Sequence, residues 1–554
     1  MFRPKLFDTL KNYNRKQFTN DVLAGIIVGI VALPLAIAFG IASGVTPEKG
    51  LITAVVAGFI ISALGGSRVQ IGGPTGAFIV IVYGIVQTYG IDGLIVATFM
   101  AGIMLIILGI ARAGAVIKFI PHPLIIGFTS GIALIIFSSQ VKDFLGLNMG
   151  DVPADFIEKW KVYFLHISTI NWYALLIASL SVLIIILWPK ITQKIPGSLV
   201  AILVTTAAVQ FLNLPVETIG SRFGVISASF PKPEIPHMDF ATIKNLVAPA
   251  FTIAILCAIE SLLSAVVSDA MISGNHKSNM ELIAQGTANI FSSIFGGIPA
   301  TGAIARTATN VKNGGRTPVA GIVHAITLLL ILLLLGKWAS YIPIANLAGI
   351  LIVVSYNMSE WKNFRSILKG PKGDVAVLLI TFLLTVIIDL TVAIEIGMVL
   401  AVFLFMRNMS KFSDVSILTK EISDDEFGYD LVEGKYELPK EVEVFEITGP
   451  LFFGAAYKFR DAMKYIKQHR KVLIIRMRHV PIIDATGIQV LKEVVREFEK
   501  LHTKIIISEL ESEQVIKELQ DSRLLFTIGK ANVKGTFEKA LERAERILED
   551  NKLA

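Results

Sequence analysis

Long apolar segments separated by short polar turns occupy most of the chain up to about residue 410. Seven of them approach the length of about 20 residues that a helix needs to cross a bilayer. These are Val22–Gly44, Gly93–Ala111, Trp172–Trp188, Pro249–Ser268, Val319–Leu335, Val375–Asp389 and Ile394–Arg407. Seven shorter ones lie between them: Leu51–Leu64, Pro74–Val86, Leu124–Val141, Gly197–Leu212, Glu281–Phe295, Ala300–Val311 and Ile342–Tyr356. The pattern predicts about fourteen helical spans, whose backbones must satisfy their own hydrogen bonds in lipid.

The polar turns carry a charge bias that predicts the topology. Lysine and arginine gather before the first span and in every second turn, and such residues stay on the cytoplasmic side. No small-residue cleavage site follows the first span, so we expect that span to be retained. The sequence therefore predicts a multi-pass protein of the plasma (inner) membrane with both termini in the cytoplasm. The residues that carry the bias are Arg3, Lys5, Lys11, Arg15, Lys16, Arg112, Lys118, Lys190, Lys194, Lys312, Arg316, Lys362, Arg365, Lys369 and Lys372.

Composition agrees with a membrane protein and narrows the chemistry. The mean hydropathy is +0.67, and 53% of the 554 residues are hydrophobic while 17% are charged. A soluble core cannot absorb that much apolar surface. The net charge of +7 is ordinary positive-inside bias, so no nucleic acid is expected as a partner. With the single cysteine Cys257, and with neither a Walker-type loop nor a metal-ligand cluster, we expect no disulfide, no cofactor, no structural metal and no enzyme.

The chain changes character near residue 411. The acidic stretch Asp424–Gly434 is typical of a linker, and alternating strand and helix patterns follow it. That alternation predicts a small α/β domain with a mainly parallel sheet. We expect a cytoplasmic N-terminus over 1–21, a transmembrane domain over 22–410 with repeats at roughly 22–212 and 249–410, a linker over 411–435 and the small domain over 436–554. Its predicted elements are strands at 441–447, 472–477 and 504–508 and helices at 455–469, 487–501 and 513–519.

An internal repeat marks the centre of the membrane region. Thr75-Gly76-Ala77 and Thr301-Gly302-Ala303 each follow a Gly-Gly pair and a proline, and each opens a run too short to cross a bilayer. The offset between them is 301 − 75 = 226, and the same offset leads from Pro34, a proline expected to break the first span, to Glu260. Interrupted spans at corresponding places in two halves point to the binding site of an inverted-repeat transporter. The alternative is a chance match in a glycine-rich protein.

Several motifs resemble the SulP anion transporters, the sulfate permease family. They are the run from Leu33 to Val45, Gly72 to Ala77, Gly127 to Gly131, Glu260 to Leu263, Ser278 to Leu282 and Ala305 to Asn310. The resemblance implies seven plus seven spans in a core and a gate domain, with the substrate between the amino ends of the third and tenth spans. It also implies a homodimer, an elevator-type movement, and Ala36 and Phe39 as the apolar wall of the site.

The terminal domain resembles the STAS domain at Ile483 to Gly487. Asp484 precedes a turn into a helix and is expected to cap it. Soluble relatives of this domain carry a phosphorylated serine after that aspartate, whereas this chain has Ala485. We therefore expect a dimerisation or docking module for a cytoplasmic regulator.

The two short motifs suit an anion. The start of a helix presents free N–H groups and about half a positive charge, so two facing starts form an anion cradle. Gly76 and Gly302 allow close approach of an oxyanion to the backbone. Ala77 and Ala303 continue each start, and Thr75 and Thr301 add hydroxyl donors, with plain helix capping as the alternative role.

Two charged residues inside predicted spans, Arg306 and Glu260, point to the chemistry of the site. A guanidinium such as that of Arg306 is expensive in a membrane unless it meets an anion, a carboxylate or water. It suits a planar or tetrahedral oxyanion; the alternatives are a pair with Glu260 or snorkelling to the cytoplasm. Glu260 is the only carboxylate in its span and predicts a cation-coupling site that takes up H⁺ or holds Na⁺ together with Ser264, one turn away. Structural pairing without coupling is the alternative.

The sequence thus predicts a secondary active transporter of small anions that works by H⁺- or Na⁺-coupled symport. Sulfate is the first candidate, on family frequency. Bicarbonate and C4-dicarboxylates also suit two helix dipoles and one arginine. An uncoupled exchanger or channel and an anion-sensing scaffold are the other classes.

Overall fold

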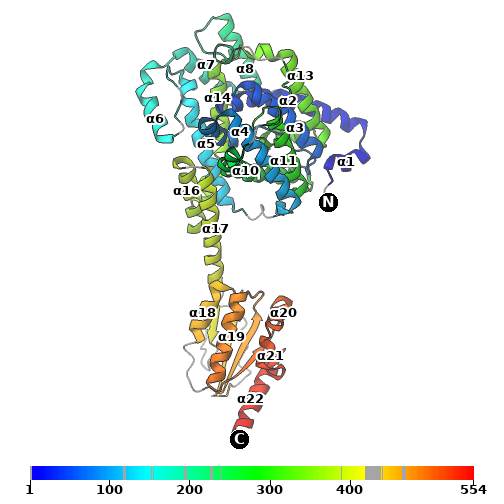
Figure 1. Ribbon diagram of the computed structural model, residues 1–554, viewed down its shortest axis with the longest axis vertical. Helices are drawn as coiled ribbons and strands as arrows, with labels where there is room; N and C mark the ends of the chain where they lie inside the picture. The colour runs from blue at the N-terminus through cyan, green and yellow to red at the C-terminus, as the bar shows by residue number, and fades with distance from the viewer. Residues whose placement is uncertain are drawn as a thin grey trace. The chain divides into compact units, whose positions relative to one another are not determined.

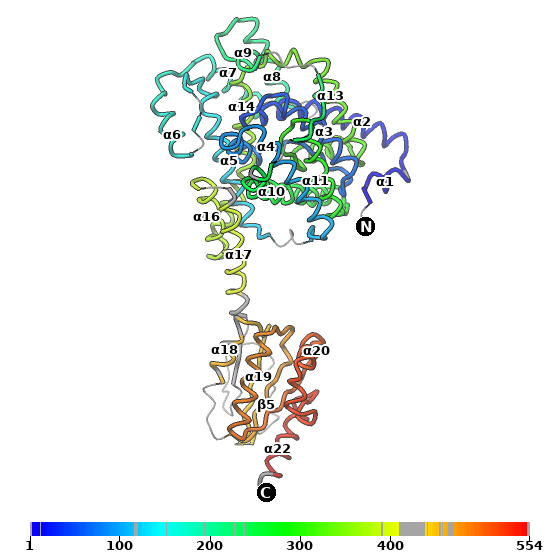
Figure 2. The backbone as a smooth tube through the Cα atoms, in the orientation of Figure 1, coloured from blue at the N-terminus to red at the C-terminus, as the bar shows by residue number. Residues whose placement is uncertain are grey.

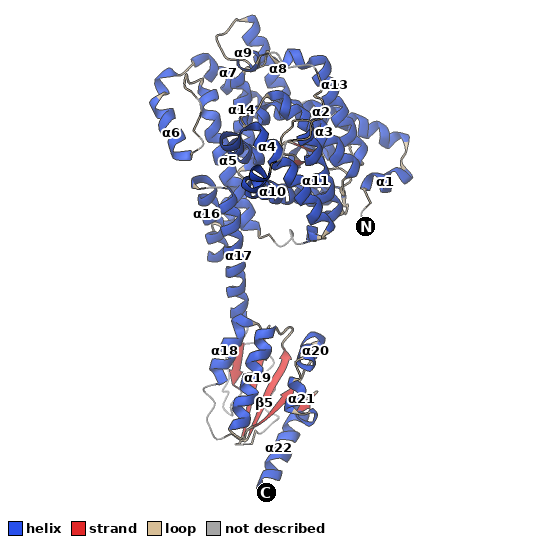
Figure 3. Ribbon diagram, in the orientation of Figure 1, coloured by secondary structure: helices blue, strands red, loops and turns tan. Residues whose placement is uncertain are grey.

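The computed structural model divides into two compact units, Met1–Ala401 and Val402–Ala554. The first unit is helical apart from two short strands, whereas the second contains a five-stranded sheet (Figure 3). The structure describes residues 3–115, 120–150, 152–153, 155–192, 196–224, 229–236, 239–388, 390–412, 414–417, 438–439, 441–463 and 470–553. Lys118, Lys194, Asp389 and residues 418–435 of the predicted linker lie outside this part of the chain.

The helices of the first unit follow the predicted spans. Seven helices in the described ranges are long and apolar enough to cross a membrane. Two of them, Pro47–Leu64 and His122–Leu145, were predicted as shorter segments, whereas the predicted long spans 375–389 and 394–407 are not among the seven. The polytopic helical class is therefore confirmed. In chain order (Figure 1) the helices are α1 (Lys5–Thr9), α2 (Arg15–Ala42), α3 (Pro47–Leu64), α4 (Ile79–Ile110), α5 (His122–Leu145), α6 (Phe156–Leu165), α7 (Trp172–Leu187), α8 (Gly197–Phe211), α9 (Ile219–Phe223), α10 (Phe240–Ile272), α11 (Ser278–Ile294), α12 (Ile304–Lys312), α13 (Pro318–Ala339), α14 (Ile344–Met358), α15 (Trp361–Ile367), α16 (Lys372–Ile387) and α17 (Leu390–Phe412).

One predicted break in a helix is absent and another is present. The first span is not broken, because α2 continues through Pro34 as one helix; prolines are tolerated in membrane helices when neighbours satisfy the freed backbone groups. In contrast, α4 contains a sharp bend at Gly90, with φ 70° and ψ −176°, which separates the two predicted spans. The segment before the bend, together with the short 3₁₀ helix η2 (Gly76–Phe78), is the first half-helix.

The two halves of the chain meet in a minimal sheet. Strand β1 (Gly72–Gly73) pairs antiparallel with β2 (Thr301–Gly302), with Gly72 opposite Gly302 and Gly73 opposite Thr301. Each strand leads directly into a half-helix, η2 and α4 after β1 and α12 after β2. Since equivalent segments of two repeats run in opposite directions, the halves have inverted topology.

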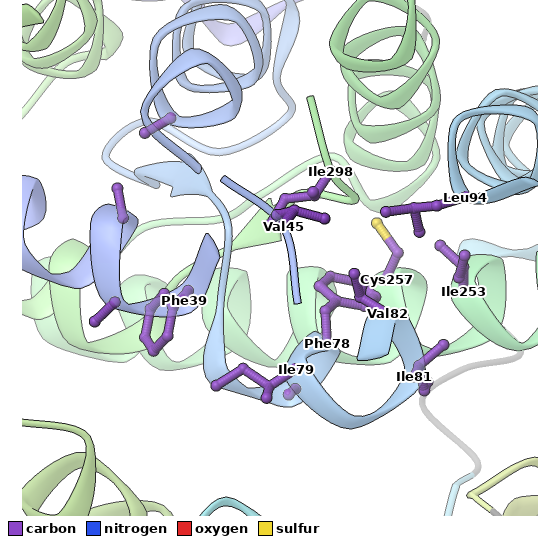
Figure 4. Packing of buried hydrophobic residues seen from close by; sticks show 14 of the residues in the cluster. Phe39, Val45, Phe78, Ile79, Ile81, Val82, Leu94, Ile253, Cys257 and Ile298 are labelled. Carbon is purple, nitrogen blue, oxygen red and sulfur yellow. The ribbon is translucent and has the colours of Figure 1, made fainter. Parts of the chain in front are cut away.

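Apolar side chains hold the first half-helix in place. Phe78, Ile79 and Val82 are almost fully buried and belong to one cluster with Ile253 and Cys257 of α10 (Figure 4). Helix α4 packs against α10 and α11, whereas α5 packs against α14 and α16 (Figure 2). The half-helix is thus fixed to α10 by close side-chain contact, which is the interaction that joins helices in lipid.

The second unit has the predicted α/β order. Its sheet runs in the order β3-β4-β5-β6-β7, with β4 to β7 parallel and β3 antiparallel to β4 at the edge. Asp484 caps α19 by accepting a hydrogen bond of 2.7 Å from the N–H of Gly487, as predicted. The elements are β3 (Asp414–Ile417), β4 (Val442–Thr448), α18 (Phe453–Met463), β5 (Val472–His479), α19 (Ala485–Lys500), β6 (Lys504–Ser508), α20 (Glu513–Asp521), α21 (Leu524–Ile528), β7 (Val533–Lys534) and α22 (Phe537–Leu553).

Candidate anion site between two half-helices

The pairing of β1 with β2 brings the two Thr-Gly-Ala motifs together. The N–H of Ala303 donates to the carbonyl of Ile71 at 2.8 Å, which extends the pairing by one residue. We call residues 74–77 the first mouth and residues 300–303 the second mouth. Each mouth is the amino end of a half-helix, where backbone N–H groups lack helical partners. The geometry that the repeat predicts, two helix starts at one place, is present.

Two glycines make this close approach feasible. Gly73 has φ +146°, and a Cβ there would lie 2.4 Å from Nη1 of Arg306. A Cβ on Gly302 would lie 1.5 Å from Nε2 of Gln70. Gln70 cannot move aside without loss, because Nε2 donates to the backbone oxygen and the hydroxyl of Ser261 at 3.2 and 3.3 Å. Only glycine fits at these two positions of the sheet.

The first mouth faces a carboxylate and an apolar wall. The hydroxyl of Thr75 donates to Oε2 of Glu260 at 2.9 Å and does not cap the helix. Both side chains are partly exposed. A Cβ on Gly76 would lie 3.5 to 3.6 Å from Phe39, Ile136 and Met358, so the backbone here is covered by apolar groups at ordinary contact distance. The predicted position of Phe39 beside the first mouth agrees with this geometry.

The second mouth is more deeply enclosed. Thr301 is fully buried, and its hydroxyl donates to the carbonyl of Cys257 at 2.9 Å. Ala303 occupies the N-cap position of α12, with no side-chain cap. Thr75 occupies the N-cap position of η2, but neither threonine hydroxyl makes a capping hydrogen bond, so the alternative of plain side-chain capping is wrong for both mouths. Ala77, the counterpart of Ala303, is also buried.

Arg306, in the second repeat, donates hydrogen bonds to the backbone of the first repeat. Its guanidinium donates to the carbonyls of Gly72 and Pro74 from the other half of the chain, and the residue is 2% exposed. No carboxylate in the described ranges lies within ion-pair distance of it. The proposed pair with Glu260 is thus absent, and so is snorkelling to solvent. A buried cation is usually paired with an anion as well as hydrogen-bonded, and among the described residues Arg306 has only the carbonyl partners.

Other predicted site residues lie elsewhere. Ser264 is fully buried, and its hydroxyl lies 3.4 Å from that of Thr307; the structure does not bring it to Glu260. Ala36 is buried where α2 touches α3, since a Cβ on Gly50 would lie 2.1 Å from the Ala36 carbonyl. The structure therefore places Ala36 at a helix-helix contact and Ser264 in a network behind the mouths.

That network contains residues to which sequence reasoning assigned no role. Glu281 of α11 is fully buried and accepts hydrogen bonds from the N–H groups of Gly66 and Ser67 at 2.8 and 3.0 Å. It also accepts from Ser261 and Gln285 at 3.3 and 2.9 Å. These bonds hold the loop that leads into β1. The sequence did contain a signal for this role, because Glu281 is a carboxylate at the start of the predicted span Glu281–Phe295.

Comparison with known proteins defines the class. The model of the sulfate permease family matches residues 18–381, and the model of the STAS domain matches residues 435–540. A membrane-spanning helical unit with paired half-helices and a STAS domain is the architecture of an anion transporter. The chain belongs to the sulfate permease family.

Individual relatives cover most of the chain. It is 42% identical over 523 residues to the "Putative sulfate transporter YvdB" of Bacillus subtilis (strain 168), covering 94% of this chain and 96% of that protein. It is 32% identical over 460 residues to the bicarbonate transporter BicA of Picosynechococcus, covering 80% of this chain and 81% of that protein.

Solved structures agree on the fold. The murine anion transporter Slc26a9 in its inward-facing state is 19% identical, with a TM-score of 0.88 over 98% of this chain and 94% of that chain. The transmembrane domain of a cyanobacterial BicA is 30% identical, with a TM-score of 0.62 over 70% of this chain and 98% of that chain. The protein is an anion transporter and not an enzyme.

Proposed function

We propose that this protein moves a small oxyanion together with a cation, with sulfate as the first substrate candidate. The observation that carries the proposal is the buried guanidinium of Arg306, which has carbonyl partners but no carboxylate partner among the described residues, beside two helix starts that β1 and β2 hold together. Helix starts and a planar cation each favour an anion, and a low-dielectric site strengthens both effects. The name of YvdB, a relative over nearly its whole length, supports sulfate.

Bicarbonate is the second candidate. It is favoured by the likeness to the bicarbonate transporter BicA in both sequence and transmembrane structure. C4-dicarboxylates carry a second carboxylate, and the side chains closest to Gly76, those of Phe39, Ile136 and Met358, are apolar, so these substrates suit the first mouth less well. A planar monovalent oxyanion and a tetrahedral dianion are thus the two substrates to compare.

Glu260 is the proposed coupling residue. Its carboxylate accepts from Thr75 at the first mouth, so a negative charge there repels an arriving anion. Uptake of a cation removes the repulsion, which links anion binding to cation binding. We favour H⁺ over Na⁺ because the hydroxyl of Ser264, the proposed partner for sodium, is directed to Thr307 and Na⁺ needs several oxygen ligands. An elevator-type movement, a homodimer, a cytoplasmic regulator of the STAS domain and a plasma-membrane location with cytoplasmic termini belong to the same proposal.

Uptake into proteoliposomes tests coupling. Radiolabelled sulfate and bicarbonate are supplied outside with an imposed inward H⁺ or Na⁺ gradient. We expect sulfate to accumulate with the H⁺ gradient, and Glu260→Gln to retain sulfate exchange while losing the response to the gradient. Glu158→Gln, which changes an exposed carboxylate on α6, is the matched control and should behave as the wild type. Uptake that is indifferent to both gradients contradicts symport.

A further inference from the structure

A cavity of about 750 Å³ lies along the first half-helix. Its lining includes Ile79 and Ile81, only a few residues beyond the first mouth, and charged side chains of α5, α6 and α9. We call this cavity the vestibule. By the predicted topology it opens on the outer side of the membrane, at the end of the half-helix away from the β1–β2 pair.

Most charges of the vestibule have partners. Arg222 of α9 pairs with Asp143 at 2.7 Å and also with Glu217. Lys142 donates to the carbonyl of Gly150 at 2.9 Å. Asp155 caps α6 by accepting from the N–H groups of Ile157 and Glu158, both at 2.9 Å. These charged groups already have ion-pair or hydrogen-bond partners within the protein.

Lys159 is different. It lines the vestibule and is only 3% exposed. Its backbone N–H donates to the carbonyl of Asp155 at 3.0 Å, but its ammonium group makes no hydrogen bond or ion pair with any residue that the structure describes. Burial lowers the pKa of its ammonium group to about 8, and the negative charge of Asp155 opposes that shift. A buried lysine without a partner is rare, because its desolvation is not repaid within the protein. An anion in the vestibule would repay it.

We propose that the ammonium group of Lys159 is an entry site where a small oxyanion binds before it reaches the half-helices. This inference rests on the proposed function, since the anion is the transported one. One ammonium in a hydrated cavity gives weak and rapidly exchanging binding, which suits a staging site. The partly apolar path along Ile79 and Ile81 then leads from this site toward Gly76.

Three variants test the site by sulfate uptake at increasing external concentration. Lys159→Gln removes the charge, Lys159→Arg keeps it, and Lys161→Gln changes an exposed lysine on the same helix. We expect Lys159→Gln to raise the KM for sulfate about tenfold, as loss of electrostatic attraction does, with the maximal rate unchanged. Lys159→Arg should restore the KM, and Lys161→Gln should not alter it. An unchanged KM in Lys159→Gln overturns the proposal.

The pH profile supplies a readout that a packing role would not move. Since the pKa of Lys159 is about 8, the cation is present below that pH and is lost above it. We expect the KM of the wild type to rise as the external pH passes 8, and this rise to be absent in Lys159→Gln. The other titratable or charged groups that line the vestibule are Tyr83, Tyr89, Lys142, Asp143, Asp155 and Arg222.

Direct binding separates this inference from the proposed function. Trp160 adjoins Lys159, and its indole donates to Ser138 at 3.2 Å, so its fluorescence reports on this corner of the vestibule. We expect sodium sulfate to change the fluorescence of the wild type and of Glu260→Gln, but not that of Lys159→Gln or Trp160→Phe. If sulfate binds in this way and no transport occurs, the entry site stands and the proposed transport of sulfate fails. If transport occurs and neither KM nor fluorescence depends on Lys159, the entry site fails alone.

Discussion

The two mouths are built from the same three residue types but meet different surroundings. At the first mouth, Thr75 donates to a partly exposed carboxylate, and apolar side chains cover Gly76 at ordinary contact distance. At the second mouth, Thr301 donates to a backbone carbonyl, and Gln70 fills the space beside Gly302. Although the two motifs have the same sequence, the first mouth contacts an ionisable group and can respond to charge, whereas the second mouth is held in place by buried neutral groups.

The largest expected effect comes from the charge that serves both mouths. Arg306 extends from the helix of the second mouth to the carbonyl of Pro74 in the first mouth and to that of Gly72 just before it. We expect Arg306→Ala to reduce anion uptake by about 100-fold, because a buried charged hydrogen-bond partner contributes about 2–5 kcal/mol. Uptake in proteoliposomes measures this, and Arg365→Ala, at an exposed position, is the control. If the Arg306→Ala variant folds and its uptake is close to normal, Arg306 does not serve both mouths in anion binding.

Steric tolerance should separate the mouths next. Gly302→Ala forces Gln70 from its buried hydrogen bonds, so we expect a loss of about 1–3 kcal/mol in stability, seen as a lower Tm. Gln70→Ala in the same chain should restore part of it. Gly76→Ala places its methyl group in ordinary contact with its neighbours, so its Tm should stay close to that of the wild type. Equal losses in both variants would contradict the division between a fixed and a responsive end.

The two threonines provide the smallest and sharpest contrast. Thr75→Val removes one donor to the carboxylate of Glu260, a change of about 1.5 kcal/mol or more for a charged partner. We expect it to alter the dependence of uptake on the H⁺ gradient with little change in Tm. Thr301→Val removes a bond between neutral groups, so it should lower the Tm modestly and leave the gradient response intact. The Tm and the response to the H⁺ gradient are measured in both variants. A loss of the gradient response in Thr301→Val, or a retained response in Thr75→Val, contradicts the assignment.

Sequence pattern was sufficient for the spans, for the two mouths and for the α/β terminal domain. Each depends on local signals: apolar length, a repeated Thr-Gly-Ala, and strand and helix periodicity. The partners of the site were not predictable in this way. Gln70 reaches Ser261, and Glu281 holds Gly66, only because packing joins residues about 200 positions apart.

Two site assignments show the same limit. The spacing of Glu260 and Ser264 places both on one face of α10, yet the hydroxyl of Ser264 turns to Thr307. Arg306 lies in the correct helix, but its contacts with Gly72 and Pro74 come from the other repeat. Periodicity specifies which face a residue occupies. The identity of the partner on that face depends on how the two halves meet.

The β1–β2 pair has a consequence for how the protein is made. Gly72 and Gly73 are inserted long before Thr301 and Gly302 leave the ribosome, and each needs the other pair to satisfy its backbone groups. An unpaired peptide group in lipid costs several kcal/mol. Until β2 is synthesised, the backbone groups of β1 must therefore be shielded from lipid by neighbouring helices or by the insertion machinery. Pairing of β1 with β2 then brings the two mouths together during biogenesis.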